Sequence, residues 1–280
     1  MRNFSIGGAF LRYEESDAFK LTAARVDALF DRAAGVPVSS PFLTPAEQYF
    51  LARRPERAGQ AGQALFFGGA PGAERKKLFV FPEYIAALAD GGDLYETAVQ
   101  FLGADAFSDI AVLKVSGGGF RDFTHRDYLG SLLALGLERD SIGDIAPIDD
   151  YSAYVFVDCR VAGFLQSTDV RVASDRVKIT RAALPEGYRI ERKYREIADT
   201  VASARLDGVV AALCNLSREA AKDKITAGEV EQNYETVERP DAPVRAHDAI
   251  SVRGHGKFCI DSVDDPTKKG RFRLRAKKYI

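Results

Sequence analysis

The sequence predicts an α+β protein built from three successive parts. The chain has 280 residues, which is enough for two or three small domains. Hydrophobic residues make up 46% of it, a content typical of packed cores and not of disordered chains. Some stretches repeat apolar residues at helical spacing, and others hold short apolar runs typical of strands. Helices and strands are therefore expected to alternate.

Residues 1–63 are predicted to form an N-terminal helical segment. Apolar side chains recur at helical spacing from Phe19 to Phe30. The run Thr44-Pro45-Ala46-Glu47 has a capping threonine, a proline at the first helical position and a glutamate that can reach back to the cap. The stretch from Arg53 to Gln63 contains one proline and two glycines and predicts a loop.

Residues 64–182 are predicted to form a middle α+β domain of the ferredoxin or RNA-recognition (RRM-like) type, because strands and helices alternate over a short length. The pattern does not give the order of the strands in the sheet. Strands are expected at 65–67, 78–81, 110–113, 151–157 and 172–179, helix starts at Asp93 and Thr124, and a short helix at 161–166.

Residues 183–203 are predicted to form a helical connector, and residues 266–280 a basic tail. The tail contains seven lysines and arginines and no acid, whereas the whole chain has a net charge of −1. The tail therefore carries +7 and the rest of the chain −8. A concentrated basic end predicts contact with a polyanion, although a solvated tail would have the same composition.

Residues 204–265 have the pattern of a compact C-terminal module of helix, turn, helix, glycine stop and strand. Ser217 is a good N-cap, and Gly228 suits a left-handed helix end. Arg218 and Lys222 are four residues apart and share a helix face. Asn233 is expected where a strand enters a turn, and residues 248–254 lead into a hairpin.

This order resembles the RNA-binding module named after ribosomal small-subunit protein four, also called the αL RNA-binding motif. Gln232 departs from the pattern, because the family has an apolar strand residue there. The resemblance implies that Asp207 orients Arg205 or caps the turn, and that five side chains contact structured RNA. They are Arg205, Ser217, Arg218, Lys222 and Asn233. Since Arg218 would be an exposed contact, Arg218→Glu is expected to weaken RNA binding without unfolding the protein.

Motifs spread from about Phe66 to the C-terminus resemble the YlmH family of bacterial RNA-binding proteins. They include Gly68-Gly69-Ala70-Pro71-Gly72-Ala73-Glu74-Arg75-Lys76, His125-Arg126-Asp127-Tyr128-Leu129-Gly130, Arg139-Asp140-Ser141-Ile142-Gly143, Arg253-Gly254-His255-Gly256-Lys257 and Thr267-Lys268-Lys269-Gly270-Arg271. The resemblance implies an RNA-binding middle domain and a cytoplasmic protein that engages rRNA of the large ribosomal subunit, and possible contact with tRNA. Members are linked to quality control of stalled nascent chains and, by older naming, to cell division.

Basic residues within these motifs are further candidates for RNA contacts. Arg75 and Lys76 are expected on a loop that enters a strand. His125 and Arg126 are expected at a helix start, where exposed amide groups attract phosphate, although capping and packing explain these residues as well. The C-terminal candidates are Arg253, Lys257, Lys268, Lys269 and Arg271.

The sequence favours a non-catalytic protein. Arg205-Leu206-Asp207 also occurs around the catalytic aspartate of pseudouridine synthases, but here it leads into the Ser217-Arg218 helix. No phosphate-binding GxxxxGK[ST] loop is present, the three cysteines form no CxxC pair, and the three histidines lack metal-ligand spacing. We therefore expect no cofactor, no metal, no membrane segment and a monomer. An RNA-modifying enzyme with an appended RNA-binding domain and a cell-division scaffold remain as alternatives.

Overall fold

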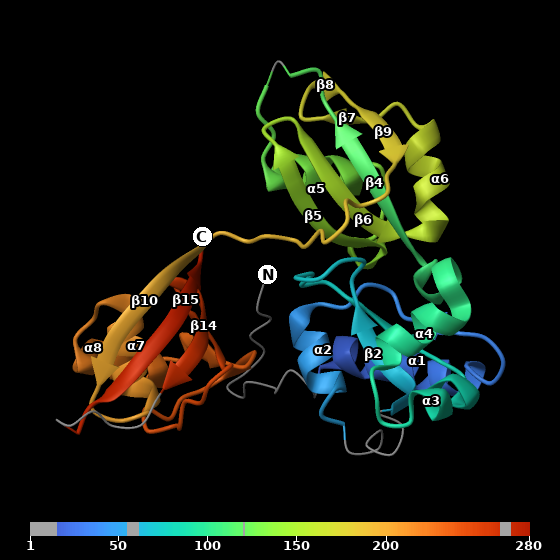
Figure 1. Cartoon of the computed structure of the whole chain (residues 1–280). Coiled ribbons are helices and arrows are strands. Elements are labelled where there is room, and N and C mark those ends of the chain that lie inside the picture. Colours follow the sequence, from blue (N-terminus) through green and yellow to red (C-terminus); the bar gives the residue numbers. More distant parts are fainter. Residues whose placement is uncertain (1–15, 55–61, 120, 264–269) are drawn as a thin grey trace. The chain divides into compact units, whose positions relative to one another are not determined.

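The computed structural model describes residues 16–54, 62–119, 121–263 and 270–280 (Figure 1). The chain divides into two compact units. One comprises residues 21–191, and the other comprises the described residues between 192 and 280. Both units combine helices with β-sheets, which confirms the predicted α+β class.

The first half of unit 21–191 is a three-stranded sheet, in the order β1-β3-β2, flanked by helices. Phe79, Phe81 and Ile85 form its core with Phe107 packed against them. The elements are α1 (Asp17–Arg32), β1 (Val38–Ser39), α2 (Pro45–Leu51), β2 (Ala64–Phe67), β3 (Lys77–Val80), α3 (Glu83–Ala89), α4 (Leu94–Leu102) and η3 (Gly103–Phe107).

Two sequence predictions are confirmed here and one is corrected. Thr44 caps α2 in a complete capping box with Glu47, and Asp93 caps α4. However, residues 1–63 do not form a purely helical segment, because β1 lies in that range and pairs with β3. The pairing partner is about 40 residues away in the sequence, so no local pattern reveals it.

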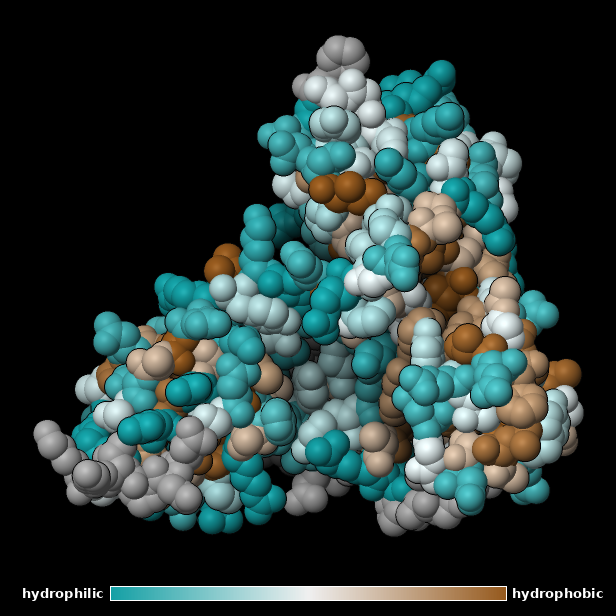
Figure 2. Space-filling model, viewed as in Figure 1, coloured by the Kyte–Doolittle hydropathy of each residue, from teal (hydrophilic) through white to brown (hydrophobic). Residues whose placement is uncertain are grey.

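The outer surface of this half is apolar over α3 and α4. Leu88 is 51% exposed and Phe101 is 54% exposed, and Tyr84, Tyr95 and Val99 are exposed as well. Figure 2 shows hydrophobic residues gathered on this part of the unit.

The second half of unit 21–191 is a four-stranded antiparallel sheet with the order β5-β6-β4-β9. The succession of strand, helix, two strands, helix and strand, with this strand order, is that of ferredoxin-like folds. Helices α5 and α6 cover one face, where Leu113, Val155 and Leu165 are buried. The elements are β4 (Ile110–Ser116), α5 (His125–Ala134), η4 (Arg139–Ser141), β5 (Ile142–Asp149), β6 (Ser152–Asp158), α6 (Cys159–Ser167), β7 (Arg171–Val172), β8 (Asp175–Arg176) and β9 (Lys178–Arg181).

This half differs from the sequence prediction in two places. The single strand expected at 172–179 is a small β7–β8 hairpin followed by the separate strand β9. Strand β5 was not expected as a strand, because Gly143 and Pro147 interrupt its sequence pattern. Its pairing with β6 shifts register near both residues.

The other face of the four-stranded sheet is closed by the chain itself. Phe156 lies on that face and is fully buried in a cluster with Phe42 and Ile190. The close approach requires Gly69, whose φ is +95° and where a Cβ would lie 2.5 Å from the Phe156 ring. Phe156 is therefore not available to stack on a ligand.

A buried ion pair joins the two halves of this unit. Lys77 Nζ in β3 lies 2.5 Å from Asp158 Oδ2 at the end of β6, and both side chains are almost fully buried. Burial alone would raise the pKa of Asp158, but hydrogen bonds from Arg160 and Lys77 outweigh it, so that the pKa lies well below its usual range. Asp158 is therefore charged in the folded protein, and Lys77 compensates this buried charge.

The C-terminal unit is a six-stranded sheet, in the order β10-β15-β14-β13-β11-β12, with α7 and α8 packed on one face. Leu206, Ile225 and Phe258 are buried between the helices and the sheet. The elements are β10 (Tyr194–Val201), α7 (Leu206–Cys214), α8 (Arg218–Thr226), β11 (Val230–Gln232), β12 (Glu235–Thr236), β13 (Ala249–Val252), β14 (Gly256–Val263) and β15 (Phe272–Tyr279).

The helical connector and the basic tail are corrected to two paired strands. Residues 194–201, expected within a helix, form β10, and residues 272–279 form β15 beside it. Every β10 residue has its partner in β15, some 80 positions later, which is why local charge patterns misled the prediction. Lys268 and Lys269 lie outside the described residues.

We predict that Lys77→Ala lowers the free energy of unfolding by about 3–5 kcal/mol, because it leaves Asp158 charged, buried and without its lysine. Chemical denaturation measures the loss. The control is Arg160→Ala, which removes a 77% exposed partner of the same carboxylate and should cost less than about 1 kcal/mol. Equal, small losses in both variants would contradict the assigned role of Lys77.

Candidate nucleic-acid interface

A fully buried carboxylate in the C-terminal unit holds two arginines at the surface. Asp207, in the first turn of α7, is 0% exposed. The Arg218 guanidinium donates from Nε and Nη2 to its two oxygens, at 3.1 Å each. Arg205 approaches the same oxygens at 3.5 Å, and the Gly208 amide donates at 2.7 Å. The side chains of Arg205 and Arg218 remain 45% and 51% exposed. The prediction that Asp207 orients Arg205 agrees with this contact, and the pair with Arg218 is the stronger one.

The charge state of this cluster is fixed by its hydrogen bonds. Burial by itself would raise the pKa of Asp207, but the bonds from Arg205, Arg218 and Gly208 lower it below the ordinary value. The carboxylate is thus ionised near neutral pH. Because two of the five N–H donors of Arg218 bind Asp207, three remain for another acceptor.

Arg218 and Arg271 border the same depression. This hollow has a volume of about 330 Å³ and lies between the start of α8, the turn after β10 and the start of β15. Arg271 donates from Nε to Thr200 Oγ1 at 2.9 Å and from Nη2 to the Thr200 carbonyl. Asp199 is an acidic neighbour in the wall. Planar guanidinium groups held by the fold are well suited to phosphate oxygens.

Helix α8 presents two more of the predicted residues beside this hollow. Ser217 is the N-cap of α8, as predicted, and its hydroxyl accepts a hydrogen bond from the Ala220 amide. Lys222 lies one turn further along the helix, where its amine is 3.5 Å from Glu219. Gly228 has a φ of +70° after the helix, as the sequence predicts.

Asn233, another predicted RNA contact, has a structural role in the fold. It adopts the left-handed conformation, with a φ of +53°. Its amide donates to Asp248, and its carbonyl oxygen accepts from the Ala249 amide. The side chain therefore ties the turn between β11 and β12 to the start of β13. Gln232, the departure from the family pattern, also donates to Asp248.

Arg253 and Lys257 lie away from the hollow. Arg253 is exposed at the turn between β13 and β14. Lys257 lies in β14 with its Nζ 5.0 Å from the ring centres of both Tyr234 and Tyr279. These two predicted residues therefore do not belong to the Arg218–Arg271 depression.

The four candidates in unit 21–191 lie in two places, Arg75 and Lys76 just before β3 and His125 and Arg126 at the start of α5. Arg75 is not presented to a ligand, because its guanidinium donates to the carbonyl oxygens of Ile142, Phe42 and Arg139. Burial lowers its pKa, in accordance with this enclosed position. Lys76 is half-buried, and its backbone pairs with Leu43.

His125 and Arg126 are exposed at the first two positions of α5. The capping alternative is present there, because Thr124 and Asp127 form a complete capping box at this helix end. Both side chains remain accessible to a ligand, but the Asp127 carboxylate already occupies the end of the helix.

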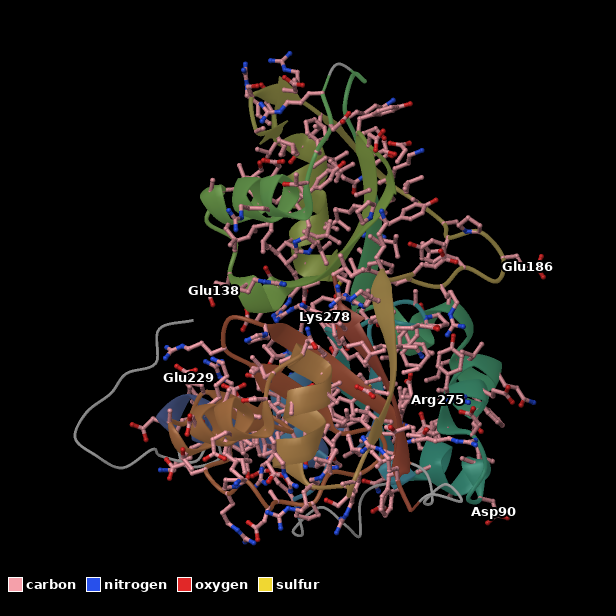
Figure 3. The ribbon with its side chains drawn as sticks, turned by 90° about the vertical axis from the view of Figure 1, so that its left-hand side faces the viewer. Asp90, Glu138, Glu186, Glu229, Arg275 and Lys278 are labelled. Carbon is pink, nitrogen blue, oxygen red and sulfur yellow. The ribbon has the colours of Figure 1, made fainter. Side chains whose placement is uncertain are left out.

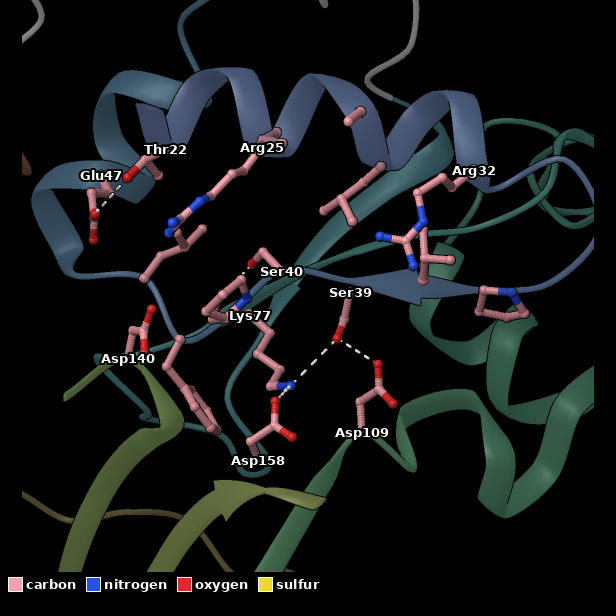
Figure 4. Close-up of a pocket in the computed structure, with 18 of the residues that line it drawn as sticks. Thr22, Arg25, Arg32, Ser39, Ser40, Glu47, Lys77, Asp109, Asp140 and Asp158 are labelled. Carbon is pink, nitrogen blue, oxygen red and sulfur yellow. Dashed lines mark hydrogen bonds and ion pairs between the residues drawn. The ribbon is translucent and has the colours of Figure 1, made fainter. Parts of the chain in front are cut away.

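The pattern in the sequence did not reveal Lys77, which adjoins the two candidates Arg75 and Lys76. Lys77 lies at the floor of a cavity of about 560 Å³ between α1, β1 and the end of β6 (Figure 4). Ser39 donates to Asp109 there and accepts a long contact from Lys77. Four basic and four acidic side chains line this cavity, so no single sign of charge prevails in it.

Two kinds of feature are absent from the described residues, a metal-ligand cluster and a helix that could span a membrane. Within them, no three histidine, cysteine or acidic side chains lie close enough together to hold a metal ion. No helix in the described part of the chain is long and apolar enough to cross a membrane.

The structure changes one expectation about substitutions. Arg218→Glu would place a second carboxylate against buried Asp207, so this variant is expected to destabilise the C-terminal unit, contrary to the expectation from the sequence. Arg271 is the better position for a charge reversal, because its guanidinium donates to the hydroxyl and the carbonyl oxygen of Thr200, which are both uncharged.

Comparison with known proteins adds three matches. A family model described as "Putative RNA-binding domain in YlmH" matches residues 106–186. The Ribosome-associated protein quality control protein P2 of Bacillus subtilis (strain 168) is 30% identical over 239 residues, which is 83% of this chain and 84% of that protein. The structure of Cell division protein ylmH from Streptococcus pneumoniae matches 65% of this chain and 99% of that chain, with 16% identity and a TM-score of 0.45.

We predict that Asp207→Asn lowers the stability of the protein near neutral pH and that its deficit shrinks in acid. A carboxylate with a depressed pKa stabilises the fold above its unfolded-state pKa, here 3.8, and loses this effect as the pH falls through the folded value. Denaturation of both proteins between pH 7 and pH 3 measures the deficit. Asp223→Asn, an exposed change on α8, is the control and should leave stability nearly unchanged. A deficit for Asp207→Asn that stays constant below pH 4 would contradict this account.

Proposed function

Because this chain belongs to the YlmH family of bacterial RNA-binding proteins, we propose that it binds structured RNA through the Arg218–Arg271 depression of its C-terminal unit. The observation that carries the proposal is the buried Asp207 carboxylate, which fixes the guanidinium of Arg218 beside the hollow that Arg271 also borders. A guanidinium held in place loses less conformational entropy when it binds a phosphate. Arg205, Ser217 and Lys222 extend this surface along α7 and α8.

The RNA we propose is ribosomal. The Bacillus subtilis relative is named for ribosome-associated protein quality control. By analogy, this chain would engage rRNA of the large subunit, and possibly tRNA, during quality control of stalled nascent chains in the cytoplasm. His125 and Arg126 offer a second, exposed basic point in the middle domain.

We propose that the protein acts by binding and not by catalysis. The enzymatic alternative, a pseudouridine-synthase-like protein, requires a reactive aspartate in the Arg205-Leu206-Asp207 motif. Asp207 is fully buried, and its oxygens accept bonds from Arg218, Arg205 and Gly208. An unchanged mass of bound RNA after incubation supports the binding role, and modified RNA would contradict it.

The ribosomal assignment is tested by sedimentation of the tagged protein from cell extract, with crosslinking and sequencing of attached RNA. Comigration with free large subunits and crosslinks to their rRNA are the expected results. Migration without RNA would contradict the assignment. Partner complexes that survive nuclease treatment would favour the division-scaffold alternative.

We predict that Arg271→Glu weakens binding to a structured rRNA fragment on the order of tenfold, because it reverses a charge at the proposed phosphate site. Fluorescence anisotropy measures the affinity. Arg195→Glu is the matched control, since Arg195 is exposed on β10 about 16 Å along the strand from Thr200. Equal affinities in the two variants would remove the depression from the binding site.

We also predict that affinity falls steeply as salt rises and that Arg271→Glu reduces the slope of log K against log[salt] by about 1. Structured RNA is read mainly through its shape and backbone, so an unstructured homopolymer should bind more weakly than a folded fragment. Titrations at several salt concentrations measure both effects. Equally tight homopolymer binding would count against recognition of structured RNA.

A further inference from the structure

One face of the C-terminal sheet is not covered by helices. Along β15, Leu274 and Ala276 are buried beneath α7 and α8, whereas the alternate residues Arg273 and Arg275 are exposed. Arg275 therefore lies on the face opposite the helices. Lys278 lies on the helix-covered face, where its amine is over the buried Phe258 ring. Both residues are labelled in Figure 3. No described residue of the open face is buried.

Aromatic side chains gather at one end of this open face. Tyr194 of β10 and Tyr279 of β15 are paired across the strands, with ring centres 5.1 Å apart in an edge-to-face arrangement. Lys257 lies 5.0 Å from Tyr279 and from Tyr234, so it braces the group by cation–π contacts. Tyr194 is the outermost ring and is 37% exposed.

Basic side chains lie on the same open face further along β15. Arg273 and Arg275 are two residues apart and so about 6.6 Å apart on the same face. Their neighbours in the adjoining strands are Thr200, Ala198 and Ser262, none of which is acidic. No described acidic side chain forms an ion pair with either arginine, so both keep their charge available.

The acids on this face lie instead beside the two lysines. Asp261 is 3.2 Å from Lys277, and Glu196 is the cross-strand neighbour of Lys277. Glu231 interacts electrostatically with Lys257. The excess positive charge of the face therefore resides on the two arginines, the nearer of which, Arg275, lies about 13 Å along β15 from Tyr279, with Lys277 between them.

We propose that this open sheet face binds an unpaired RNA segment, with a base stacked on Tyr194 and phosphates at Arg273 and Arg275. Exposed aromatic rings beside a row of cations are the combination that binds single-stranded nucleic acid, because every base has a stacking face and every nucleotide a charge. From Arg273 to Tyr279 the row spans about 20 Å. The proposal rests on the proposed RNA-binding function, but it assigns a second surface that does not involve the Arg218–Arg271 depression.

The test uses the full-length protein and two RNAs. One is an RNA hairpin, and the other is the same hairpin with a single-stranded 3′ extension of mixed sequence. Wild-type protein is expected to bind the extended RNA on the order of tenfold more tightly than the hairpin alone, as measured by fluorescence anisotropy. Circular dichroism checks that each variant is folded.

Variants of the open face should remove this gain and leave hairpin affinity unchanged. Tyr194→Leu keeps apolar bulk but removes the ring, whereas Tyr194→Phe keeps the ring and should keep the gain. Arg275→Glu should also abolish the gain. The control, Arg195→Glu, makes the same charge change on the neighbouring edge strand β10, on the other face of the sheet, and should retain the gain.

The outcomes separate the two proposals. Arg271→Glu, which weakens hairpin binding, should leave the ratio of the affinities for the extended hairpin and the plain hairpin unchanged. Loss of the gain in Tyr194→Leu and Tyr194→Phe alike would exclude stacking and overturn the proposal. So would an extension that adds no affinity to wild-type protein, which would leave this face for a protein partner. Absence of hairpin binding altogether would instead contradict the proposed function itself.

Discussion

The salt bridge between buried Asp207 and the arginines that cover it is the interaction on which the C-terminal unit depends. A fully buried carboxylate is costly unless charged partners and amides satisfy it, and here Arg218, Arg205 and Gly208 do so. The same bonds set the position of the α8 start relative to α7 and hold Arg218 at the edge of the depression. The stability of the unit and its candidate function therefore both depend on the pair Asp207–Arg218, and a substitution of either residue affects both.

Local patterns predicted the elements whose determinants are local. The capping boxes at Thr44 and Thr124, the N-cap at Ser217 and the left-handed glycine at Gly228 are all formed as expected, because each depends on residues within one helical turn. The succession of α7, α8 and β11 follows from the same signals. The resemblance to a family added the candidate residues, of which Arg218 and Arg271 line the depression and Arg205 shares Asp207 with Arg218.

Pairings between distant residues could not be predicted in this way. Residues 194–201 are rich in charge and were expected to be helical, yet their partner strand lies some 80 positions later. In 272–279 the alternation of apolar and basic residues is the signature of a half-buried strand, but the high charge favoured the interpretation as a tail. For the same reason the sequence did not reveal the roles of Asn233 and Arg75 inside the fold, since these depend on Asp248 and on three distant carbonyl groups. The burial of Phe156 against Ile190, which closes one face of the four-stranded sheet, also depends on residues far apart in the sequence. On the six-stranded sheet, by contrast, the aromatic pair Tyr194 and Tyr279 lies on an open face.

Mapping of protein–RNA crosslinks by mass spectrometry, on the protein bound to large ribosomal subunits, tests the central claim most directly. The account predicts crosslinked peptides that contain Arg205, Arg218 or Arg271, the three arginines placed around Asp207 and the depression. Crosslinks confined to unit 21–191, with none in the C-terminal unit, would contradict it.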